Sequence, residues 1–208
     1  MSKATVTIRH VAERAKVSTA TVSRVLNNNP CVRQRTRQTV LEAIDSLGYK
    51  LNVVARSLKT SRTNTIGVLA PDLSGDFFMF IAESMNRELA RRGYSLVVGT
   101  SQSSEEEEAK QVRHLAERLV DGIVLIPVGG SNAYLPQISD FNIPIVFVDR
   151  ILKGYRADKV LVDNEEGACK AVSALIGEGH HRIGYLGGNP EVTTAEERYK
   201  GYCRAMKE

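Results

Sequence analysis

In the chain after residue 63, short apolar runs rich in β-branched residues alternate with longer amphipathic stretches. The runs that predict strands are TIGVLAP, YSLVVGT, DGIVLIPV, IPIVFVD, KVLVD and RIGYLGG. Helical spacing marks FFMFIAESMNRELARRG and EEEEAKQVRHLAERLV, which lie between the first three of these runs. Apolar strands separated by helices form a parallel sheet with both faces covered. We therefore predict an α/β core with a parallel sheet.

The chain before residue 64 has the spacing of short helices. One apolar face follows the i, i+3, i+4, i+7 pattern and consists of Ile8, Val11, Ala12 and Ala15. Ser18 predicts the N-cap of a second helix, because a serine hydroxyl accepts a hydrogen bond from a free N–H of the first turn. The inward residues of that helix are predicted to be Val22, Val25 and Leu26. A third helix over 36–47, ended by Gly48, is predicted to turn inward Val40, Leu41, Ile44 and Leu47.

The other face of the second helix is small and polar with a single cation, and it consists of Thr19, Ala20, Ser23, Arg24 and Asn27. A helix that enters the major groove of DNA needs such a face, because a few side chains must reach base edges and none may be bulky. Two helices joined by a short turn form the helix-turn-helix arrangement. The alternative is a three-helix domain with an ordinary solvated face.

The distribution of charge favours the DNA interpretation. Residues 1–63 contain 12 Lys and Arg but 3 Asp and Glu, whereas residues 64–208 contain 16 and 21. The first region therefore carries a net charge of +9 within a chain whose total is +4. A basic head on a mildly acidic body indicates that the head meets a polyanion.

Composition excludes several other classes. No apolar run approaches the ~18 residues that a membrane-spanning helix needs, and MSKATVTIRH lacks the apolar segment of an export signal. Three scattered cysteines, Cys31, Cys169 and Cys203, indicate reduced thiols and a cytoplasmic location. The run 105–108 of four glutamates opens a predicted helix, where carboxylates complement the helix dipole. We expect it to be a solvated helix start and not an acidic binding surface.

The stretch VAERAKVSTATVSRVLNNNPCVRQRTRQTVLEAIDSLGYKLNVVARSL resembles the N-terminus of the lactose-repressor/galactose-repressor (LacI/GalR) family of bacterial transcription regulators. NTIGVLAPDLSGDFF, VDGIVLIPV, IPIVFVDR and later segments resemble the effector-binding core of that family. The resemblance implies an all-α head of three helices with a hinge helix, followed by a periplasmic-binding-protein-like core. The implied domains are a DNA-binding head at 1–50, a hinge and linker at 51–63, a first lobe at 64–163 and a partial second lobe at 164–208.

The same resemblance assigns roles in DNA binding. It implies base contacts from Thr19, Ala20 and Arg24, together with backbone contacts from Thr7, Ser18, Thr21, Ser23 and Asn27. In the hinge, it implies that Leu58 wedges between base pairs in the minor groove beside the small residue Ala55, with Asn52 as a plausible N-cap. The chain departs from the family at Leu51, where proline is usual. The implied partners are double-stranded operator DNA of palindromic sequence and a second copy of the chain, as a homodimer in the bacterial cytoplasm at the nucleoid.

Ligands of open α/β sheets bind beyond the carboxyl ends of the strands. There the resemblance implies effector contacts from Asp72, Phe77, Phe78, Asp149, Arg150, Thr194 and Arg198. Alternatives remain open for some of them, because one of the two phenylalanines could be core and Asp149 could cap the turn after its strand. The effector classes implied by the family are sugars, sugar phosphates and purines, with no cofactor.

The competing class is an α/β enzyme for sugars or nucleotides with a helical appendage. The chain has no GxxxxGK[ST], GxGxxG, HExxH or GxSxG motif, and GGN at 187–189 lacks the fingerprint spacing. His180 and His181 point in different directions if adjacent in a strand or turn, so we expect them to enter the strand RIGYLG and not to hold a metal. The resemblance implies that family members continue well past residue 208, from which we expect a fragment of a longer protein or a truncated product with weakened or lost effector control.

Overall fold

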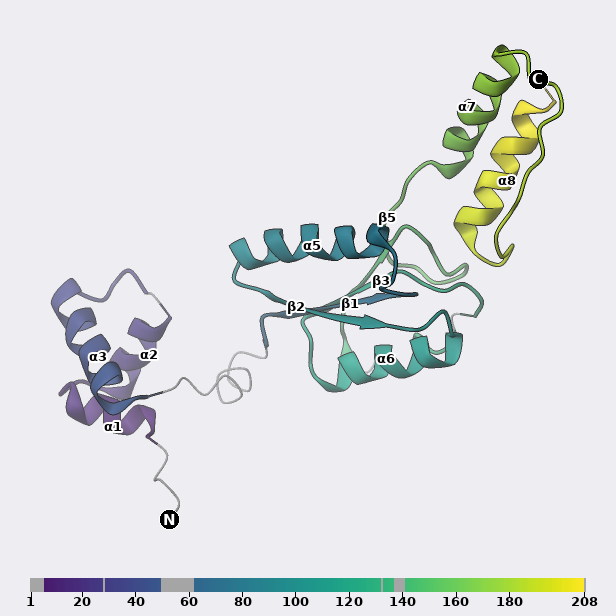
Figure 1. Ribbon diagram of the computed structural model, residues 1–208. Coiled ribbons are helices and arrows are strands. Elements are labelled where there is room, and N and C mark those ends of the chain that lie inside the picture. Colours follow the sequence, from purple (N-terminus) through teal and green to yellow (C-terminus); the bar gives the residue numbers. More distant parts are fainter. Residues whose placement is uncertain (1–5, 28, 50–61, 132, 137–140, 208) are drawn as a thin grey trace. The chain divides into compact units, whose positions relative to one another are not determined.

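The computed structural model describes residues 6–27, 29–49, 62–131, 133–136 and 141–207. The chain divides into two compact units, residues 1–56 and residues 57–208, and each is described by itself. Figure 1 labels the helices and strands of both units.

The first unit is a bundle of three short helices. They are α1 (Ile8–Arg14), α2 (Thr19–Leu26) and α3 (Gln34–Leu47). Each helix contributes a fully buried valine to one small core, namely Val11, Val22 and Val40. Ser18 caps α2, since its hydroxyl accepts a hydrogen bond from the amide of Thr21 at 3.1 Å, and Gly48 ends α3 with a φ of 59°. The three predicted helices, the serine cap and the glycine stop are confirmed.

One inward position of α3 was predicted wrongly. Leu41 is 43% exposed, whereas Ala43 is buried in the core beside Val40. The buried face therefore follows 40, 43, 44 and 47, which is the i, i+3, i+4, i+7 spacing, and residue 41 lies one helical step away from it. The helix also begins at Gln34, two residues before the predicted start.

The second unit is built on a five-stranded parallel sheet of order β2-β1-β3-β4-β5. The strands are β1 (Thr65–Ala70), β2 (Ser95–Thr100), β3 (Gly122–Leu125), β4 (Ile145–Val148) and β5 (Asp158–Val160). Helices α5 (Asp76–Arg91) and α6 (Glu105–Glu117) cover opposite faces of the sheet (Figure 1). The predicted α/β core with a covered parallel sheet is confirmed.

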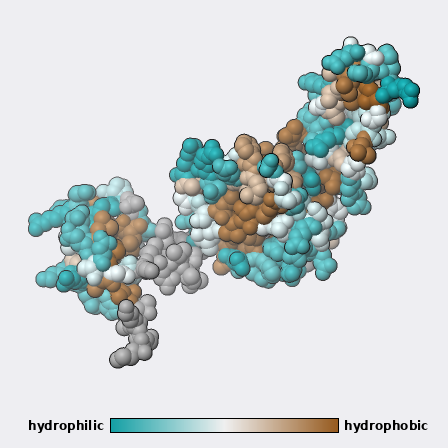
Figure 2. Space-filling view, in the orientation of Figure 1, coloured by the Kyte–Doolittle hydropathy of each residue, from teal (hydrophilic) through white to brown (hydrophobic). Residues whose placement is uncertain are grey.

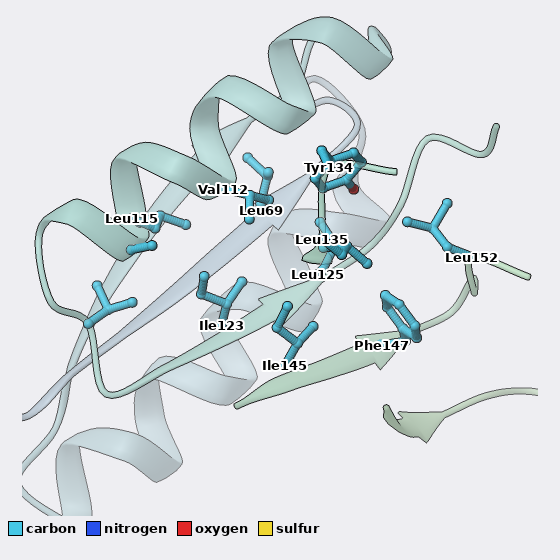
Figure 3. Close-up of a cluster of buried hydrophobic side chains, with 12 residues drawn as sticks. Leu69, Val112, Leu115, Ile123, Leu125, Tyr134, Leu135, Ile145, Phe147 and Leu152 are labelled. Atoms are coloured by element: carbon cyan, nitrogen blue, oxygen red, sulfur yellow. The ribbon is translucent and has the colours of Figure 1, made fainter. Parts of the chain in front are cut away.

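The main core lies between α6 and the sheet. Figure 3 shows Val112 and Leu115 of α6 above the strand residues Leu69, Ile123, Leu125, Ile145 and Phe147, all of which are buried. Gly67 of β1 makes this approach possible, because a Cβ there would lie 2.8 Å from the nearest methyl carbon of Leu115. Figure 2 shows apolar surface over the middle of the unit, where α5 and β2 face the viewer. The exposed large apolar residues of these two elements are Phe77, Met79, Phe80, Val97 and Val98.

The helices α7 (Asn164–Gly177) and α8 (Thr193–Ala205) lie side by side (Figure 1). Their small core contains Cys169, Val172 and Ala205. Gly201 brings the two backbones together, because a Cβ at this position would lie 2.1 Å from the carbonyl oxygen of Glu165. The α7–α8 pair therefore depends on the absence of a side chain at residue 201.

The strand predicted at RIGYLGG is wrong, since these residues have no strand structure and Leu186 is fully exposed. A strand needs a neighbour to take up its backbone hydrogen bonds, and none of the described strands runs beside this segment. Aromatic packing holds the segment instead, because the ring of Tyr185 stacks on that of Tyr202 with centroids 5.2 Å apart.

The glutamates at 105–108 are not all solvated, which corrects the expectation for this run. Glu108 is fully buried, and its carboxylate accepts hydrogen bonds from the amide of Val128 at 2.8 Å and the hydroxyl of Tyr134 at 2.5 Å. Glu105 accepts a hydrogen bond from the amide of Ser131 at 3.1 Å. The first turn of α6 therefore holds the loop that follows β3.

Substituting Gly201 with alanine tests the close packing of α7 on α8. The added methyl group would overlap the backbone of α7, so we expect Gly201→Ala to lower the free energy of unfolding by about 1–3 kcal/mol. Gly167→Ala is the matched control, because residue 167 lies inside α7 with nothing within 4 Å of a Cβ. That control should gain about 0.5–1 kcal/mol from helix propensity. Urea unfolding followed by circular dichroism measures both, and equal stability of the two variants contradicts the prediction.

The buried carboxylate of Glu108 gives a second prediction, on pH. Burial raises the pKa of Glu108 above its ordinary value of 4.5, against the opposing effect of its hydrogen bonds. Compared with the unfolded chain, the folded state therefore binds the proton of Glu108 more tightly, and the stabilisation that this gives at low pH is lost as pH rises through the raised pKa. We expect the stability of Glu108→Gln relative to the natural chain to increase with pH above 4.5. Urea unfolding across this range measures it, and the exposed Glu106→Gln should show no such trend.

Candidate functional sites in the two units

The outer face of α2 carries the three residues predicted to read bases. Thr19, Ala20 and Arg24 are all exposed, and so is Asn27, whereas Thr21 and Ser23 are half-buried. The face is held by contacts on the opposite side of the helix, where Val22 and Val25 are buried in the three-helix core.

The two ends of α2 are fixed by hydrogen bonds. Ser18 caps the first turn, and the guanidinium of Arg37 on α3 donates to the carbonyl oxygens of Asn29 at 2.7 Å and Val25 at 3.4 Å. Arg37 was not identified from the sequence, where it is one of several arginines around the start of α3. It ties the residues after α2 to α3 and so sets the direction of the exposed face.

Thr7 and Ser18, both predicted to contact the DNA backbone, precede α1 and α2. The amide of Thr7 donates to Nδ1 of His10 at 3.1 Å, as in a capping box. His10 is a further residue that the sequence did not single out. The hinge residues Asn52, Ala55 and Leu58 lie outside the described residues, so their assigned roles stay predictions.

Arg150, just after β4, brings several predicted ligand contacts together at the carboxyl edge of the sheet. Its guanidinium carbon lies 5.6 Å from the ring centroid of Phe78, and its Nη1 donates to the carbonyl oxygen of Pro127 at 3.4 Å. Its Nε lies 3.4 Å from a carboxylate oxygen of Asp149, yet this buried Nε has no hydrogen-bond partner. Phe78, Asp149 and Arg150 thus form one cluster, in which the buried Nε of Arg150 is paired by charge with Asp149.

The backbone of Asp149 lies in the left-handed region, with a φ of 65°. Burial raises the pKa of its carboxyl group, and the positive charges of Arg150 and Arg198 act against that rise. The carboxylate therefore faces cations. The alternative that it caps its own turn finds no support among the hydrogen bonds of the described residues.

The side chain of Asp72 accepts hydrogen bonds from its own loop. One carboxylate oxygen accepts hydrogen bonds from the amide of Ser74 at 3.1 Å, the hydroxyl of Ser74 at 2.9 Å and the amide of Gly75 at 3.3 Å. These bonds lower the pKa of Asp72, with a smaller effect from the charge of Arg150.

The alternative that Phe77 or Phe78 belongs to the core is wrong. Phe77 is 55% exposed, Phe78 is half-buried, and neither belongs to a buried cluster. Their rings meet edge to face with centroids 5.3 Å apart. Both rings therefore remain accessible at the start of α5, beside Arg150.

The start of α8 is joined to the loop after β4. The amide of Ile151 donates to the hydroxyl of Thr193 at 3.4 Å, and Lys153 pairs with Glu196 at 2.7 Å. Thr194, a predicted ligand contact, is buried at 4% exposure.

Arg198 has a partner within the protein, because its Nε donates to Oδ1 of Asn164 at 2.9 Å. Asn164 in turn donates to Glu197 at 3.2 Å, so it links α7 to α8. Asn164 and Arg198 border a cavity of about 400 Å³, whose lining also includes Ala168, Tyr185 and Tyr202. No role was assigned to Asn164 from the sequence, and its bond to Arg198 could not be deduced from sequence spacing.

Metal sites and membrane spans were searched over the described ranges. In that part of the chain, no group of three or more His, Cys, Asp or Glu side chains could hold a metal ion. His180 and His181 are both exposed there. No helix among the described residues is long and apolar enough to cross a membrane.

Comparisons with known proteins match both units. The family described as bacterial regulatory proteins, lacI family, matches residues 7–52, and the periplasmic binding protein domain matches residues 66–208. Catabolite control protein A of Priestia megaterium is 34% identical over 204 residues, which are 98% of this chain and 61% of that protein. The chain thus spans less than two thirds of the length of this relative.

Two solved structures are also similar. A crystal structure of the lac repressor dimer bound to operator and the anti-inducer ONPF has a TM-score of 0.82 at 27% identity, covering 98% of this chain and 62% of that one. A complex of the transcriptional regulator CelR with cellobiose has a TM-score of 0.61 at 30% identity, covering 97% and 61%. All three names are those of regulators and not of enzymes, which counts against the enzyme alternative. The chain belongs to the lacI family of bacterial regulatory proteins, with a periplasmic binding protein domain as its second unit.

Proposed function

We propose that this chain is a transcriptional repressor that reads a specific DNA operator with α2 and responds to a small ligand at the carboxyl edge of its sheet. The exposed face of α2 supports the first part most directly. Thr19, Ala20 and Arg24 project from a helix whose other side is buried and whose ends are capped. Such a protein acts in the bacterial cytoplasm, at the nucleoid.

Base reading depends mainly on Arg24. A guanidinium donates two hydrogen bonds to the O6 and N7 of guanine, whereas alanine and the threonine methyl contact the thymine methyl. Thr7, Ser18, Thr21, Ser23 and Asn27 lie on or beside the same helices and would contact phosphates, which set the register of the head on the duplex. Beyond the described residues, Leu58, Ala55 and Asn52 would form the hinge that opens the minor groove.

Substituting Arg24 with alanine tests base reading. We expect Arg24→Ala to lose about 1–3 kcal/mol of discrimination between the selected operator and one altered at the contacted guanine. An operator is first selected from random duplexes, and electrophoretic mobility shifts then give both affinities at fixed salt.

Arg14→Ala is the matched control for charge, because Arg14 is an exposed cation at the end of α1 in the same unit. It should weaken binding to both duplexes alike and leave their ratio unchanged. A ratio for Arg24→Ala equal to that of the natural chain contradicts the assignment.

A palindromic operator requires two copies of the head. The apolar surface of α5 and β2 supports self-association, because soluble monomers rarely expose contiguous apolar patches of this kind. Phe80 is the most exposed of its large residues, at 69%. The similar lac repressor structure is a dimer on its operator.

A charge placed in this surface tests the dimer. We expect Phe80→Glu to shift the chain from dimer to monomer in analytical ultracentrifugation, with an association constant lower by about tenfold or more. Leu186→Glu is the control, because Leu186 is a fully exposed apolar residue away from α5 and β2. A monomeric natural chain, or an unchanged dimer in Phe80→Glu, contradicts this part of the proposal.

The ligand edge is supported by the cluster of Phe78, Asp149 and Arg150. The Nε of Arg150 is ion-paired with Asp149, and other guanidinium N–H groups of Arg150 could donate to a ligand hydroxyl or phosphate oxygen. The accessible ring of Phe78 beside it suits the apolar face of a sugar or a purine. Asp72, Phe77, Asp149, Thr194 and Arg198 would complete the contacts. Cellobiose in the CelR complex is an example of such a ligand in a similar protein.

Isothermal titration of the 208-residue chain with a panel of sugars, sugar phosphates and purines tests the ligand edge. A stoichiometric response that Arg150→Gln weakens at least about tenfold would support the proposal. Binding that is unchanged in Arg150→Gln, or absent for the whole panel, would count against it.

A further inference from the structure

The point where the chain enters the sheet of the second unit is held by one side chain. Asp121, in the turn between α6 and β3, accepts hydrogen bonds from the amide of Thr63 at 2.8 Å and from the amide of Asn64 at 3.0 Å. The hydroxyl of Thr63 lies 3.1 Å from the same carboxylate and donates to the carbonyl oxygen of Leu119 at 2.9 Å. Thr63 and Asn64 immediately precede β1.

Backbone hydrogen bonds reinforce this junction from both sides. The amide of Asp121 donates to the carbonyl oxygen of Thr65 at 2.8 Å. The amide of Ser95 donates to the carbonyl oxygen of Asn64, also at 2.8 Å. The residues before β1 are therefore bonded to the starts of both neighbouring strands. A charged acceptor strengthens such an arrangement, because hydrogen bonds to an ionised group are stronger than those between neutral groups.

The junction also contains backbone conformations that residues other than glycine adopt at a cost. Asn64 has a φ of 51° and Leu119 a φ of 56°, both in the left-handed region. Such conformations persist only where surrounding contacts fix them, and they gather where geometry matters for function. Both residues are contacted through the Thr63–Asp121 pair, so the junction is held in one conformation against its own local preference.

The junction lies where the chain from the first unit enters the sheet of the second unit. The covalent connection between the unit of residues 1–56 and the sheet of the second unit passes through Thr63 and Asn64. We propose that Asp121 is a positioning residue for operator binding, because it fixes the point at which the chain leaves the core toward the DNA-binding head. This inference rests on the proposed function.

A positioning role differs in a measurable way from a purely structural one. Two heads tethered at fixed points bind a pair of half-sites with an effective concentration that depends on the tether. Freeing Thr63 and Asn64 from Asp121 would lengthen the tether and lower that concentration. Affinity for a single half-site depends on the head alone and does not change.

The first measurement concerns the junction itself. Hydrogen exchange of the full chain is followed at the amides of Thr63 and Asn64 in Asp121→Asn. We expect both amides to exchange at least about tenfold faster than in the natural chain, because each loses a charged acceptor. Glu117→Gln is the matched control, since it removes a carboxylate that is exposed at the end of α6. Unchanged exchange in Asp121→Asn overturns the proposal.

The second measurement concerns DNA. Affinities are measured for a duplex with both half-sites and for one with a single half-site. In Asp121→Asn, the ratio of the first affinity to the second should fall by up to about twofold, while the single-site affinity and base preference stay unchanged. Thr63→Val keeps the carboxylate of Asp121 and removes only the hydroxyl of Thr63, so it should lower the ratio less than Asp121→Asn does. This second variant keeps the proposal testable if Asp121→Asn fails to fold.

The two measurements separate the possible failures. If the natural chain binds both duplexes and the ratio in Asp121→Asn equals that in Glu117→Gln, the positioning role is wrong although the proposed function stands. If the natural chain binds neither duplex specifically, the proposed function itself fails. Faster exchange together with a reduced ratio supports the inference.

Discussion

All five strands of the core run parallel, and this constraint decides where each functional group of the second unit can lie. In a parallel sheet every carboxyl end reaches one edge and every amino end reaches the other. Phe78, Asp149 and Arg150 therefore gather at one edge, while Asn64 and Asp121 meet at the opposite edge. The packing of α6 on the sheet, for which Gly67 leaves room, buries the strands between these two edges.

The elements of the fold could be predicted from the sequence wherever periodicity alone decides burial. Val22 and Val40 lie on clear helical faces and are buried as predicted. Leu41 failed because a helix in a small bundle buries a narrow face, and one step around the axis reaches solvent. RIGYLGG failed for a different reason, since strand formation depends on a neighbouring strand, and local sequence carries no information about that neighbour.

In the candidate sites, too, local features could be predicted from the sequence, whereas contacts between distant residues could not. The cap at Ser18 follows from a local rule, and the structure confirms it. The family resemblance pointed to Arg150 and Arg198 as ligand contacts, and these roles stay predictions. Residue type could not supply Asn164 as the partner of Arg198, nor Val128 and Tyr134 as donors to Glu108, because these pairs are more than fifteen residues apart in the chain. A run of glutamates predicts solvation on average, and only the fold shows which one faces inward.

The contacts between α8 and the sheet bear on how a ligand could act. Gly201 makes α7 and α8 pack with their backbones in contact, whereas the start of α8 meets the loop after β4 through a hydroxyl at Thr193 and the Lys153–Glu196 pair. Polar contacts of this kind exchange readily with water, because each is worth little once solvent can replace it. A ligand held by Arg150 on one side and by the start of α8 on the other would bind one arrangement of the sheet and α8 more tightly than another. Such a difference in affinity is the condition for a conformational response. Since β1 and β3 begin next to Asn64 and Asp121 and end at the carboxyl edge, the same two strands would connect the proposed ligand site with the point where the chain enters the sheet.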